Sequence, residues 1–302
     1  MTGEVKKSLF ISLIGKPNVG KSSLLNMILG EKISIVSPKP QTTRNKIVGI
    51  LTQDNVQLVF TDTPGMLTPK NKLGNYMLSE INNSFLGAEA IIHVVDVNSK
   101  LSDSDINFVK KFKKYNVPVI LVLNKIDLLK NKADMMKTIQ EYSEIFSYNS
   151  IIPVSAINSD GKTELLAELF KLAKPSVFFY GEDDITDQSQ RTIVSEIIRE
   201  KMLYLLDKEI PHGVAVFIEK FHFRNESIVD IDALIQCEKN NHKSIIIGKN
   251  GNMIKKIGML ARKDIEDMVG SKVNLKLWVK VKENWRNSNA TLKDLGYILE
   301  NT

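Results

Sequence analysis

The tetrapeptide Asn124-Lys125-Ile126-Asp127 follows an apolar segment and ends in a carboxylate whose position suggests a specific chemistry. The apolar residues 117–123 before it predict a buried strand. Ligands of open α/β sheets bind at the carboxyl ends of the strands, where Asp127 would lie. A carboxylate there accepts two hydrogen bonds from the adjacent N–H donors of guanine, an edge that adenine lacks. Because an unpaired buried carboxylate is costly, such a site discriminates strongly between purines.

A glycine-rich segment near the N-terminus has the residue types that hold phosphates. Residues 15–22 fit the pattern G-x-x-x-x-G-K-[ST], between an apolar strand at 10–14 and a helical pattern at 23–29. Backbone N–H groups of such a loop surround phosphates, and the helix N-terminus adds positive potential. We expect Lys21 to reach the β- and γ-phosphates and the Ser22 hydroxyl to bind Mg²⁺. The nucleotide-binding residues predicted here are Gly15, Lys16, Pro17, Asn18, Val19, Gly20, Lys21, Ser22 and Ser23.

Three further segments would complete a nucleotide site. Asp62, in the run Asp62-Thr63-Pro64-Gly65-Met66 after the predicted strand 56–60, would hold Mg²⁺ through water, and the Gly65 N–H would sense the γ-phosphate. A threonine of Gln41-Thr42-Thr43-Arg44 would meet Mg²⁺ when the γ-phosphate is present; we favour Thr43, and Thr42 stays open. After the predicted strand 151–154, Ser155-Ala156 would offer an N–H to the guanine carbonyl oxygen.

These five segments, in this order, resemble those of Ras-like GTPases over residues 8–174. The resemblance implies an α/β P-loop fold, with Lys21, Thr43, Gly65 and Asn18 as catalytic residues and Ser22, Thr43 and Asp62 around Mg²⁺. Met66 stands where Ras has a glutamine that orients water, and a thioether does this poorly, so we expect slow hydrolysis by the isolated protein. In related GTPases an asparagine like Asn18 helps to hold K⁺; a plain loop-stabilising role is weighted equally.

The rest of the chain is long enough for a second domain. An acidic linker at 175–189 precedes helix 190–207, strand 214–223, strand 227–237, two helices and strand 273–281 within residues 190–284; residues 285–302 are a predicted tail. A G-x-x-G lies between the two later helices. This order resembles a type II KH domain, an α+β fold whose G-x-x-G loop lies against single-stranded RNA. The residues predicted to bind RNA are Gly248, Lys249, Asn250, Gly251, Lys255 and Lys256.

The charge distribution agrees with an anionic partner for the last part of the chain. Residues 177–238 hold six Lys/Arg against thirteen Asp/Glu, whereas residues 239–302 hold thirteen against six, and the whole chain carries +6. Cys237 is the only cysteine, which excludes an intramolecular disulfide and is compatible with the cytoplasm. We find no apolar run long enough to span a membrane, no secretory signal and no zinc-ligand spacing, and we favour a monomer.

Across nearly its whole length the chain resembles the Era family of bacterial GTPases. The shared segments include residues 41–44, 184–191, 196–201 and 285–297, besides the nucleotide motifs. The resemblance implies GTP and GDP as ligands and binding of the 3′ end of 16S rRNA near the anti-Shine–Dalgarno sequence. It also implies a role in 30S subunit maturation, and a cytoplasmic location with peripheral association at the inner membrane.

Two alternative functions are weighed against this one. In the first alternative, the chain is a regulatory GTPase whose C-terminal domain binds a protein or the membrane surface instead of RNA. The second, an RNA-binding module with a degenerate nucleotide pocket, is disfavoured because Lys21, Ser22, Asp62, Asn124 and Asp127 are all present. Under the leading hypothesis, GTP and Mg²⁺ order the segments around Thr43 and Gly65, which favours RNA binding until hydrolysis releases them.

Overall fold

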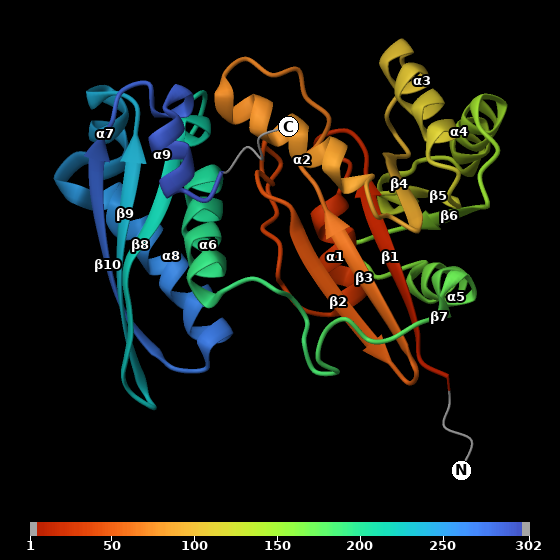
Figure 1. Ribbon diagram of the computed structural model, residues 1–302. Coiled ribbons are helices and arrows are strands. Elements are labelled where there is room, and N and C mark those ends of the chain that lie inside the picture. Colours follow the sequence, from red (N-terminus) through yellow and green to blue (C-terminus); the bar gives the residue numbers. More distant parts are fainter. Residues whose placement is uncertain (1–4, 298–302) are drawn as a thin grey trace. The chain divides into compact units, whose positions relative to one another are not determined.

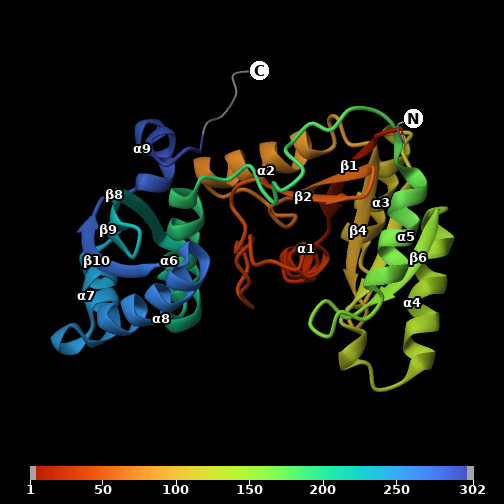
Figure 2. The same ribbon diagram turned by 90° about the horizontal axis from the view of Figure 1, so that it is seen from below.

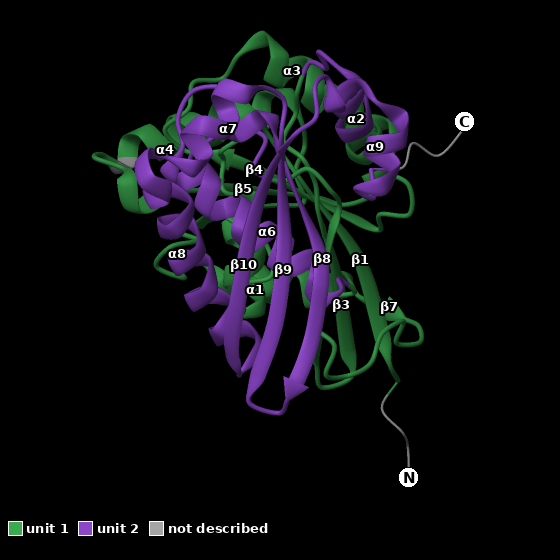
Figure 3. Cartoon of the chain, turned by 90° about the vertical axis from the view of Figure 1, so that its left-hand side faces the viewer, with its two compact units in different colours: residues 1–36, 43–67, 78–187 green, residues 37–42, 68–77, 188–302 purple. Residues whose placement is uncertain are grey.

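The computed structural model describes residues 5–297 and groups them into two compact units, shown in Figure 3. Within the described residues, unit 1 holds residues 5–36, 43–67 and 78–187. Unit 2 holds residues 37–42, 68–77 and 188–297. Two short segments from the first third of the chain therefore pack with the C-terminal unit, one immediately before Thr43 and the other shortly after Gly65.

Unit 1 is built on a mostly parallel sheet with the strand order β2-β3-β1-β4-β5-β6 (Figure 1). The strands β1, β3, β4, β5 and β6 run parallel, β2 pairs antiparallel with β3, and the short β7 pairs antiparallel with β1. All six residues of β5 are buried, as expected for a parallel strand covered on both faces. The strand bounds are β1 Lys7–Ile14, β2 Ile47–Gln53, β3 Val56–Asp62, β4 Ala90–Asp96, β5 Val119–Asn124, β6 Ser150–Val154 and β7 Lys174–Pro175.

Helices cover both faces of this sheet. One core cluster joins Leu24 and Leu165 to the strands, and the other joins Ile81, Phe108 and Tyr142 to the opposite strand residues. This doubly wound arrangement places the strand-to-helix loops at the carboxyl edge of the sheet, the edge at which ligands bind. The helices are α1 Lys21–Leu29, α2 Lys72–Ser84, α3 Asp103–Val109, η1 Lys110–Lys114, η2 Ile126–Leu128, α4 Lys132–Ile145 and α5 Lys162–Leu172.

Unit 2 is a three-stranded sheet with the order β10-β9-β8, in which β8 and β9 are antiparallel and β9 and β10 are parallel. Its core joins buried residues of α6 and α8, such as Ile198 and Ile257, to one face of the sheet (Figure 2). The predicted α-β-β-α-α-β order is confirmed. The elements are α6 Gln190–Leu205, η3 Pro211–Gly213, β8 Val214–Asn225, β9 Ile228–Cys237, α7 Asn240–Ile247, η4 Lys249–Gly251, α8 Asn252–Val269, β10 Lys272–Val281, η5 Trp285–Asn287 and α9 Asn289–Asp294.

Two segments are more structured than their sequences indicate. In the acidic linker, Phe179 and Tyr180 donate backbone N–H groups to the Gln57 Oε1 atom, and the Ile185 carbonyl accepts from the Ile50 N–H, so the linker packs on unit 1. In the predicted tail, the fully buried Trp285 donates its indole N–H to the Gly213 carbonyl at 3.0 Å, and α9 follows. Non-local contacts order both segments, and such contacts leave no periodic signal in the local sequence.

Several strand and helix ends differ from the predicted ones because pairing and capping set the last residues. The strand predicted at 10–14 begins at Lys7, which pairs with Val56. The helix predicted to begin at Ser23 begins at Lys21, and the helix predicted to end at residue 207 ends at Leu205. No helix within residues 5–297 has an apolar stretch long enough to cross a lipid bilayer.

Candidate functional site

The phosphate loop of unit 1 connects β1 to α1 and is closed against the neighbouring strand ends. Gly20 has a φ of +95°, and a Cβ at this position would lie 2.2 Å from the Asn124 Nδ2 atom. The Asn124 amide donates to the Val19 carbonyl at 2.9 Å, and the Lys125 Nζ donates to the Asn18 carbonyl at 2.7 Å. The loop and the N-K-x-D segment are therefore directly hydrogen-bonded, although about 100 residues separate them in the sequence.

Lys21 is buried at the base of the loop with its ammonium group facing backbone carbonyls. Its Nζ donates to the Gly15 carbonyl at 3.3 Å and to the Lys16 carbonyl at 3.1 Å. Burial lowers the pKa of Lys21 to about 8, although the negative charge of Asp62 acts in the opposite direction. A phosphate oxygen offers this ammonium a stronger, charge-assisted partner than a carbonyl, so the geometry suits a polyphosphate.

Three oxygen-bearing side chains predicted to surround Mg²⁺ come together beside Lys21. The Ser22 hydroxyl donates to the Asp62 Oδ2 atom at 2.6 Å, and the Ser22 and Thr43 hydroxyl oxygens lie 2.9 Å apart. The buried Asp62 Oδ1 atom has no hydrogen-bond partner within the described residues. Burial raises the pKa of Asp62 despite the neighbouring Lys21 charge and hydroxyl groups. Hard oxygen donors and an unsatisfied carboxylate oxygen suit Mg²⁺, whose positive charge would favour the charged form of Asp62.

The two candidate threonines have different environments. The Thr43 hydroxyl lies 3.5 Å from the Asp62 Oδ2 atom, in addition to its contact with Ser22. The Thr42 hydroxyl instead donates to the Lys39 carbonyl at 2.6 Å. Thr43 is the threonine that faces the candidate metal residues in this structure. One neighbour was missed by the sequence analysis: Ser34 is buried and donates to the Asp62 Oδ2 atom at 3.2 Å, and no motif marks it.

The residues predicted to bind the base are held by one another at the ends of β5 and β6. The Asn124 Oδ1 atom accepts from the Ala156 N–H at 3.1 Å, and the Ser155 hydroxyl donates to the Asp127 Oδ1 atom at 2.6 Å. Lys125 also forms an ion pair with Asp96 at 2.7 Å. Ile126 packs at the edge of a core cluster, so its side chain supports the loop. The Asp127 side chain is exposed at this edge of the sheet, so the buried carboxylate implied by the sequence is not observed. Selection by Asp127 of a base with two adjacent donors stays a prediction.

The Asp62–Met66 segment packs against the phosphate loop. The Met66 N–H donates to the Gly15 carbonyl at 3.3 Å, and the Thr63 hydroxyl donates to the Leu13 carbonyl at 3.1 Å. The Met66 side chain packs against a core cluster on the α2–α4 side of the sheet. Pro64 and Gly65 lie between Thr63 and Met66 and run alongside the phosphate loop. The structure thus brings the phosphate-loop, Asp62–Met66, N-K-x-D and Ser155-Ala156 segments to one edge of the sheet, with Ser23 in the first turn of α1.

The G-x-x-G segment of unit 2 lies at the start of α8 beside a groove. Gly248 has a φ of +75°, and a Cβ there would lie 2.7 Å from the Met253 Cβ, so only glycine fits. Lys249 and Asn250 between the glycines are exposed, as are Lys255 and Lys256. The groove has a volume of about 440 Å³, and its lining residues are Ile254, Lys255, Gly258, Met259, Arg262, Leu275 and Leu277.

Comparisons with known proteins bear on both units. Residues 10–125 match the family described as 50S ribosome-binding GTPase, and residues 209–286 match the KH domain family. The GTPase Era of Ruminiclostridium cellulolyticum is 46% identical over 291 residues, covering 96% of this chain and 97% of the relative. The chain belongs to the Era family of GTPases. The GTPase Era of Clostridium kluyveri is 49% identical over 292 residues and covers 96% of this chain and 99% of its own.

Solved Era structures have the same fold. A crystal structure of Era in complex with MgGDPNP and nucleotides 1506–1542 of 16S ribosomal RNA has a TM-score of 0.93 and 36% identity, and covers 97% of this chain and 100% of its own. A single-residue variant of Aquifex aeolicus Era bound to GDP·AlF₄⁻ has the same TM-score, identity and coverage. Both predicted fold classes, the P-loop GTPase domain and the C-terminal KH domain, are confirmed.

Proposed function

We propose that this Era-family GTPase is a nucleotide-operated switch that binds the 3′ end of 16S rRNA and assists maturation of the 30S subunit. The observation that carries the proposal is the joining, in one chain, of the hydrogen-bonded residues predicted to bind a guanine nucleotide with a groove in the KH domain beside an exposed G-x-x-G. The Era relative solved with MgGDPNP and 16S nucleotides 1506–1542 supports both ligands. GTP, GDP and this RNA are the proposed partners, and the cytoplasm is the proposed location.

As a member of this family the chain hydrolyses GTP to GDP and phosphate, and we propose the role of each residue in that step. Lys21 exchanges its two carbonyl partners for phosphate oxygens and offsets the charge that develops on them. The Gly65 N–H contacts the γ-phosphate. Ser22, Thr43 and Asp62 would hold Mg²⁺, which when bound neutralises phosphate charge. Asp127, Asn124 and Ala156 orient the base.

Slow intrinsic hydrolysis is part of the proposal. The Met66 side chain packs against a core cluster and has no group that orients water. The rate of GTP hydrolysis therefore depends on positive charges that stabilise the phosphates. A monovalent cation beside Asn18, which has a φ of +64°, is the proposed additional charge. Hydrolysis is therefore expected to be faster in K⁺ than in Na⁺ at equal ionic strength. Equal rates would remove the K⁺ role and leave Asn18 as a loop residue.

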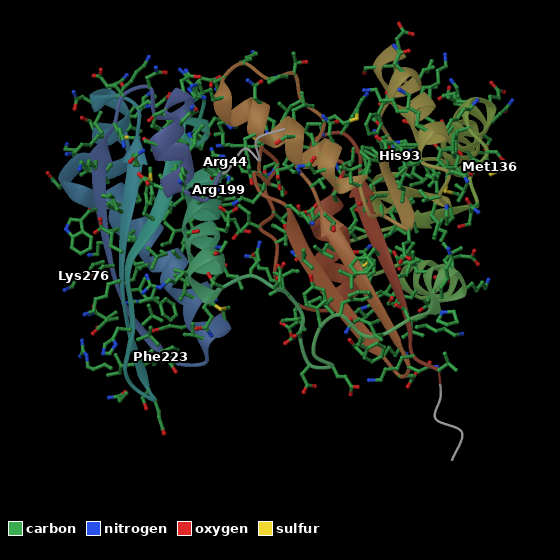
Figure 4. The ribbon with its side chains drawn as sticks, viewed as in Figure 1. Arg44, His93, Met136, Arg199, Phe223 and Lys276 are labelled. Carbon is green, nitrogen blue, oxygen red and sulfur yellow. The ribbon has the colours of Figure 1, made fainter. Side chains whose placement is uncertain are left out.

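The route from nucleotide to RNA affinity runs through residues 37–42, which pack within unit 2. The buried Arg199 of α6, labelled in Figure 4, donates to the Thr42 carbonyl and forms an ion pair with Glu196. The Lys39 ammonium donates to the Leu206 carbonyl and lies 3.2 Å from an Asp207 carboxylate oxygen. Thr43, the next residue along the chain, contacts Ser22. Binding of Mg²⁺ and the γ-phosphate at Thr43 would therefore alter the position of Thr42 and its contact with Arg199 of α6.

Residues 68–77 provide a second route of the same kind. The Lys72 backbone N–H donates to the Asn287 Oδ1 atom at 3.1 Å, and the Tyr76 and Tyr297 ring centroids lie 5.3 Å apart. This segment follows Gly65 by a few residues, so the nucleotide state at Gly65 would reach the C-terminal part of unit 2. By linkage, RNA must change GTP affinity by the factor by which GTP changes RNA affinity.

The test is direct binding of the 3′ end of the protein's own 16S RNA in the presence of GDP or a non-hydrolysable GTP analogue. We expect tighter RNA binding with the analogue, and we expect Arg199→Ala to reduce the ratio of the two affinities. Lys137→Ala, which removes an exposed cation of α4, is the control and leaves the ratio unchanged. Identical RNA affinity in both nucleotide states of the wild-type protein would exclude the switch.

The alternative occupant of the C-terminal domain is a protein or a membrane surface. The exposed lysines around the G-x-x-G favour any anionic partner, and peripheral association with the cytoplasmic face of the membrane is part of the proposal. Flotation with vesicles containing anionic lipid, with and without competing RNA, distinguishes membrane binding from RNA binding. Competition between RNA and vesicles would mean that they share the lysine surface, whereas vesicle binding without RNA binding would favour the alternative.

A further inference from the structure

The strand β10 has two faces with different chemistry. Its alternate residues Val273, Leu275 and Leu277 belong to or pack against the core of unit 2. The residues between them lie on the opposite side of the sheet because side chains alternate along a strand. This second set is exposed, with the sequence Lys272, Asn274, Lys276, Trp278 and Lys280.

The register of the sheet extends this second set across β9 and β8. Trp278 lies opposite Leu234, which in turn lies opposite Phe217 of β8, and this gives a short apolar row. In the adjacent row, Lys276 lies opposite Asp232, which lies opposite Lys220. We call this surface the open face; its residues by register are Phe217, Lys220, His222, Asp230, Asp232, Leu234, Lys272, Asn274, Lys276, Trp278 and Lys280. Arg224, at a register shift in β8, joins it through its hydrogen bond to Asp230.

No helix within residues 188–297 covers most of this open face. Figure 3 views the three strands directly, with α6 behind them and α9 at one end. Lys276 points away from the sheet on the side opposite α6 (Figure 4). Trp278 is 45% exposed, which is unusual for the largest apolar side chain, whereas Trp285 is fully buried. The open face is thus a partly aromatic surface that folding of unit 2 leaves accessible.

The positive charge of β10 on this face is only partly offset from within, by Asp232 opposite Lys276. Asp230 is already satisfied: Arg224 donates to it at 2.6 Å, Asn274 donates at 2.9 Å, and Lys220 lies 3.7 Å away. Hydrogen bonds from Asn274 and Arg224 lower the pKa of Asp230 to about 2. Lys272, Lys276 and Lys280 have no carboxylate within ion-pair distance among residues 5–297. Lysines flanking an exposed tryptophan therefore attract an anion that also has a flat ring.

We propose that the open face binds a segment of single-stranded RNA, with a base stacked on Trp278 and phosphates at Lys276 and Lys280. Unpaired bases stack on aromatic side chains of exposed sheets, whereas the bases of a duplex are not accessible for such stacking. The inference rests on the proposed RNA binding by this domain and extends it beyond the G-x-x-G groove.

The position of β10 supports one RNA strand that contacts both surfaces. β10 is an edge strand of its sheet, so its outer edge has no neighbouring strand among the described residues. Leu275 and Leu277 line the groove beside α8, while Lys276 and Trp278 belong to the open face. An RNA longer than the four nucleotides that a G-x-x-G loop holds would pass the free edge of β10 and reach Trp278.

The test compares RNAs of four and twelve nucleotides from the 3′ end of the protein's own 16S RNA. Because the other tryptophan, Trp285, is buried, a change in intrinsic fluorescence reports mainly on Trp278. We expect the twelve-nucleotide RNA to quench this fluorescence and the four-nucleotide RNA to bind without quenching. Trp278→Ala is expected to lower affinity for the longer RNA about tenfold, and Trp278→Phe to restore part of it.

Charge reversal provides an independent measurement. The double variant Lys276→Glu/Lys280→Glu is expected to lower the affinity for the twelve-nucleotide RNA and to reduce the salt dependence of that binding. Binding of the four-nucleotide RNA is expected to be unchanged. The matched control, Lys113→Glu/Lys114→Glu, reverses two exposed lysines of η1 in unit 1 and is expected to bind both RNAs like the wild type. Thermal unfolding establishes that each variant is folded.

Each outcome has a defined meaning. Failure of both RNAs to bind the wild type would overturn the proposed RNA-binding function itself. Binding of both RNAs with wild-type affinity by the Trp278 and lysine variants would overturn the open-face proposal alone. Equal competition by a twelve-base-pair duplex would exclude base stacking, and the open face would then be assigned to a partner other than single-stranded RNA.

Discussion

The nucleotide site of unit 1 and the G-x-x-G surface of unit 2 are constructed in opposite ways. In unit 1 the functional side chains hold one another: Asn124 joins Val19 to Ala156, and Ser155 fixes Asp127. In unit 2, Lys249 and Lys256 are exposed, and no ion pair involves either of them among the described residues. A site fixed by its own hydrogen bonds is preorganised for one ligand, whereas a surface of free lysines attracts any polyanion.

The difference determines how each region should respond to change. Loss of one member of a preorganised site leaves other buried groups unpaired, so single substitutions are expected to have large effects that salt changes little. Each exposed lysine contributes a modest, screened and roughly additive amount. A substitution at Asp127, substitutions in the G-x-x-G and a change of pH that acts on Lys21 test this contrast, in order of decreasing expected effect.

The largest effect is expected for Asp127→Asn. Guanine would lose two hydrogen bonds to a charged acceptor, each of about 1.5–3 kcal/mol, so GTP affinity should fall on the order of 10³-fold. Xanthosine triphosphate should gain affinity, because its carbonyl replaces the guanine amine and can accept from the new amide. Calorimetric titration of both nucleotides measures the exchange, with thermal unfolding as the control for folding. Equal competition by ATP and GTP for the wild-type protein would contradict the assigned role of Asp127.

A smaller effect is expected from a new charge at the second glycine of the G-x-x-G. Gly251 has a φ of +75° with open space around a Cβ, so a side chain fits there at a modest backbone cost. Gly251→Asp should lower RNA affinity about 10²-fold, since a carboxylate would face phosphates. Gly251→Asn is the matched control, because asparagine tolerates the left-handed conformation and adds no charge.

The salt dependence distinguishes the two regions within the same experiment. Lys249→Ala should reduce the slope of log affinity for RNA against log salt by about 1 and leave GTP affinity unchanged. A loss of GTP affinity on changing Lys249 or Gly251 would mean that the two sites are not built as separately as the structure indicates.

The smallest effect is a pH dependence of nucleotide binding that arises at Lys21. With a pKa of about 8 in the empty protein, Lys21 loses its charge as pH rises from 7 to 9, so GTP affinity should fall about tenfold. The stability of the empty protein should change in the opposite direction. Between pH 8 and the ordinary lysine pKa of 10.5, the unfolded chain binds more protons, so stability rises with pH.

Measurement of GTP affinity at pH 7, 8 and 9 checks the first trend, and chemical denaturation of the empty protein checks the second. Lys21→Arg is the control, because a guanidinium stays charged over this range and should give a flat affinity profile. A wild-type profile equally flat would show that the Lys21 ammonium remains protonated in the empty site.

The sequence specified most of the nucleotide site because its motifs are local. Residues 15–22 and 124–127 each combine a strand end, a turn and a polar group within a few positions, and backbone geometry alone then fixes where the side chain lies. The G-x-x-G spacing likewise identified Gly248 and Gly251 from the local sequence. The order of elements in the C-terminal domain, and the motif-bearing strands of the first domain, also followed from hydrophobic patterning, with errors of a few residues at the ends; strands β2 and β4 and helices α2, α3 and α4 were not predicted.

Other features depend on residues that meet only after folding. The facing of Thr43, rather than Thr42, toward Ser22 depends on how one loop crosses another, and the contact of Ser34 with Asp62 follows from the same packing. Arg199 meets Thr42 across 157 positions of sequence. The open face required the register of three strands, because a one-residue shift would turn Trp278 and Lys276 toward the core. Local chemistry is encoded in neighbouring residues, whereas the meeting of distant side chains is decided by packing.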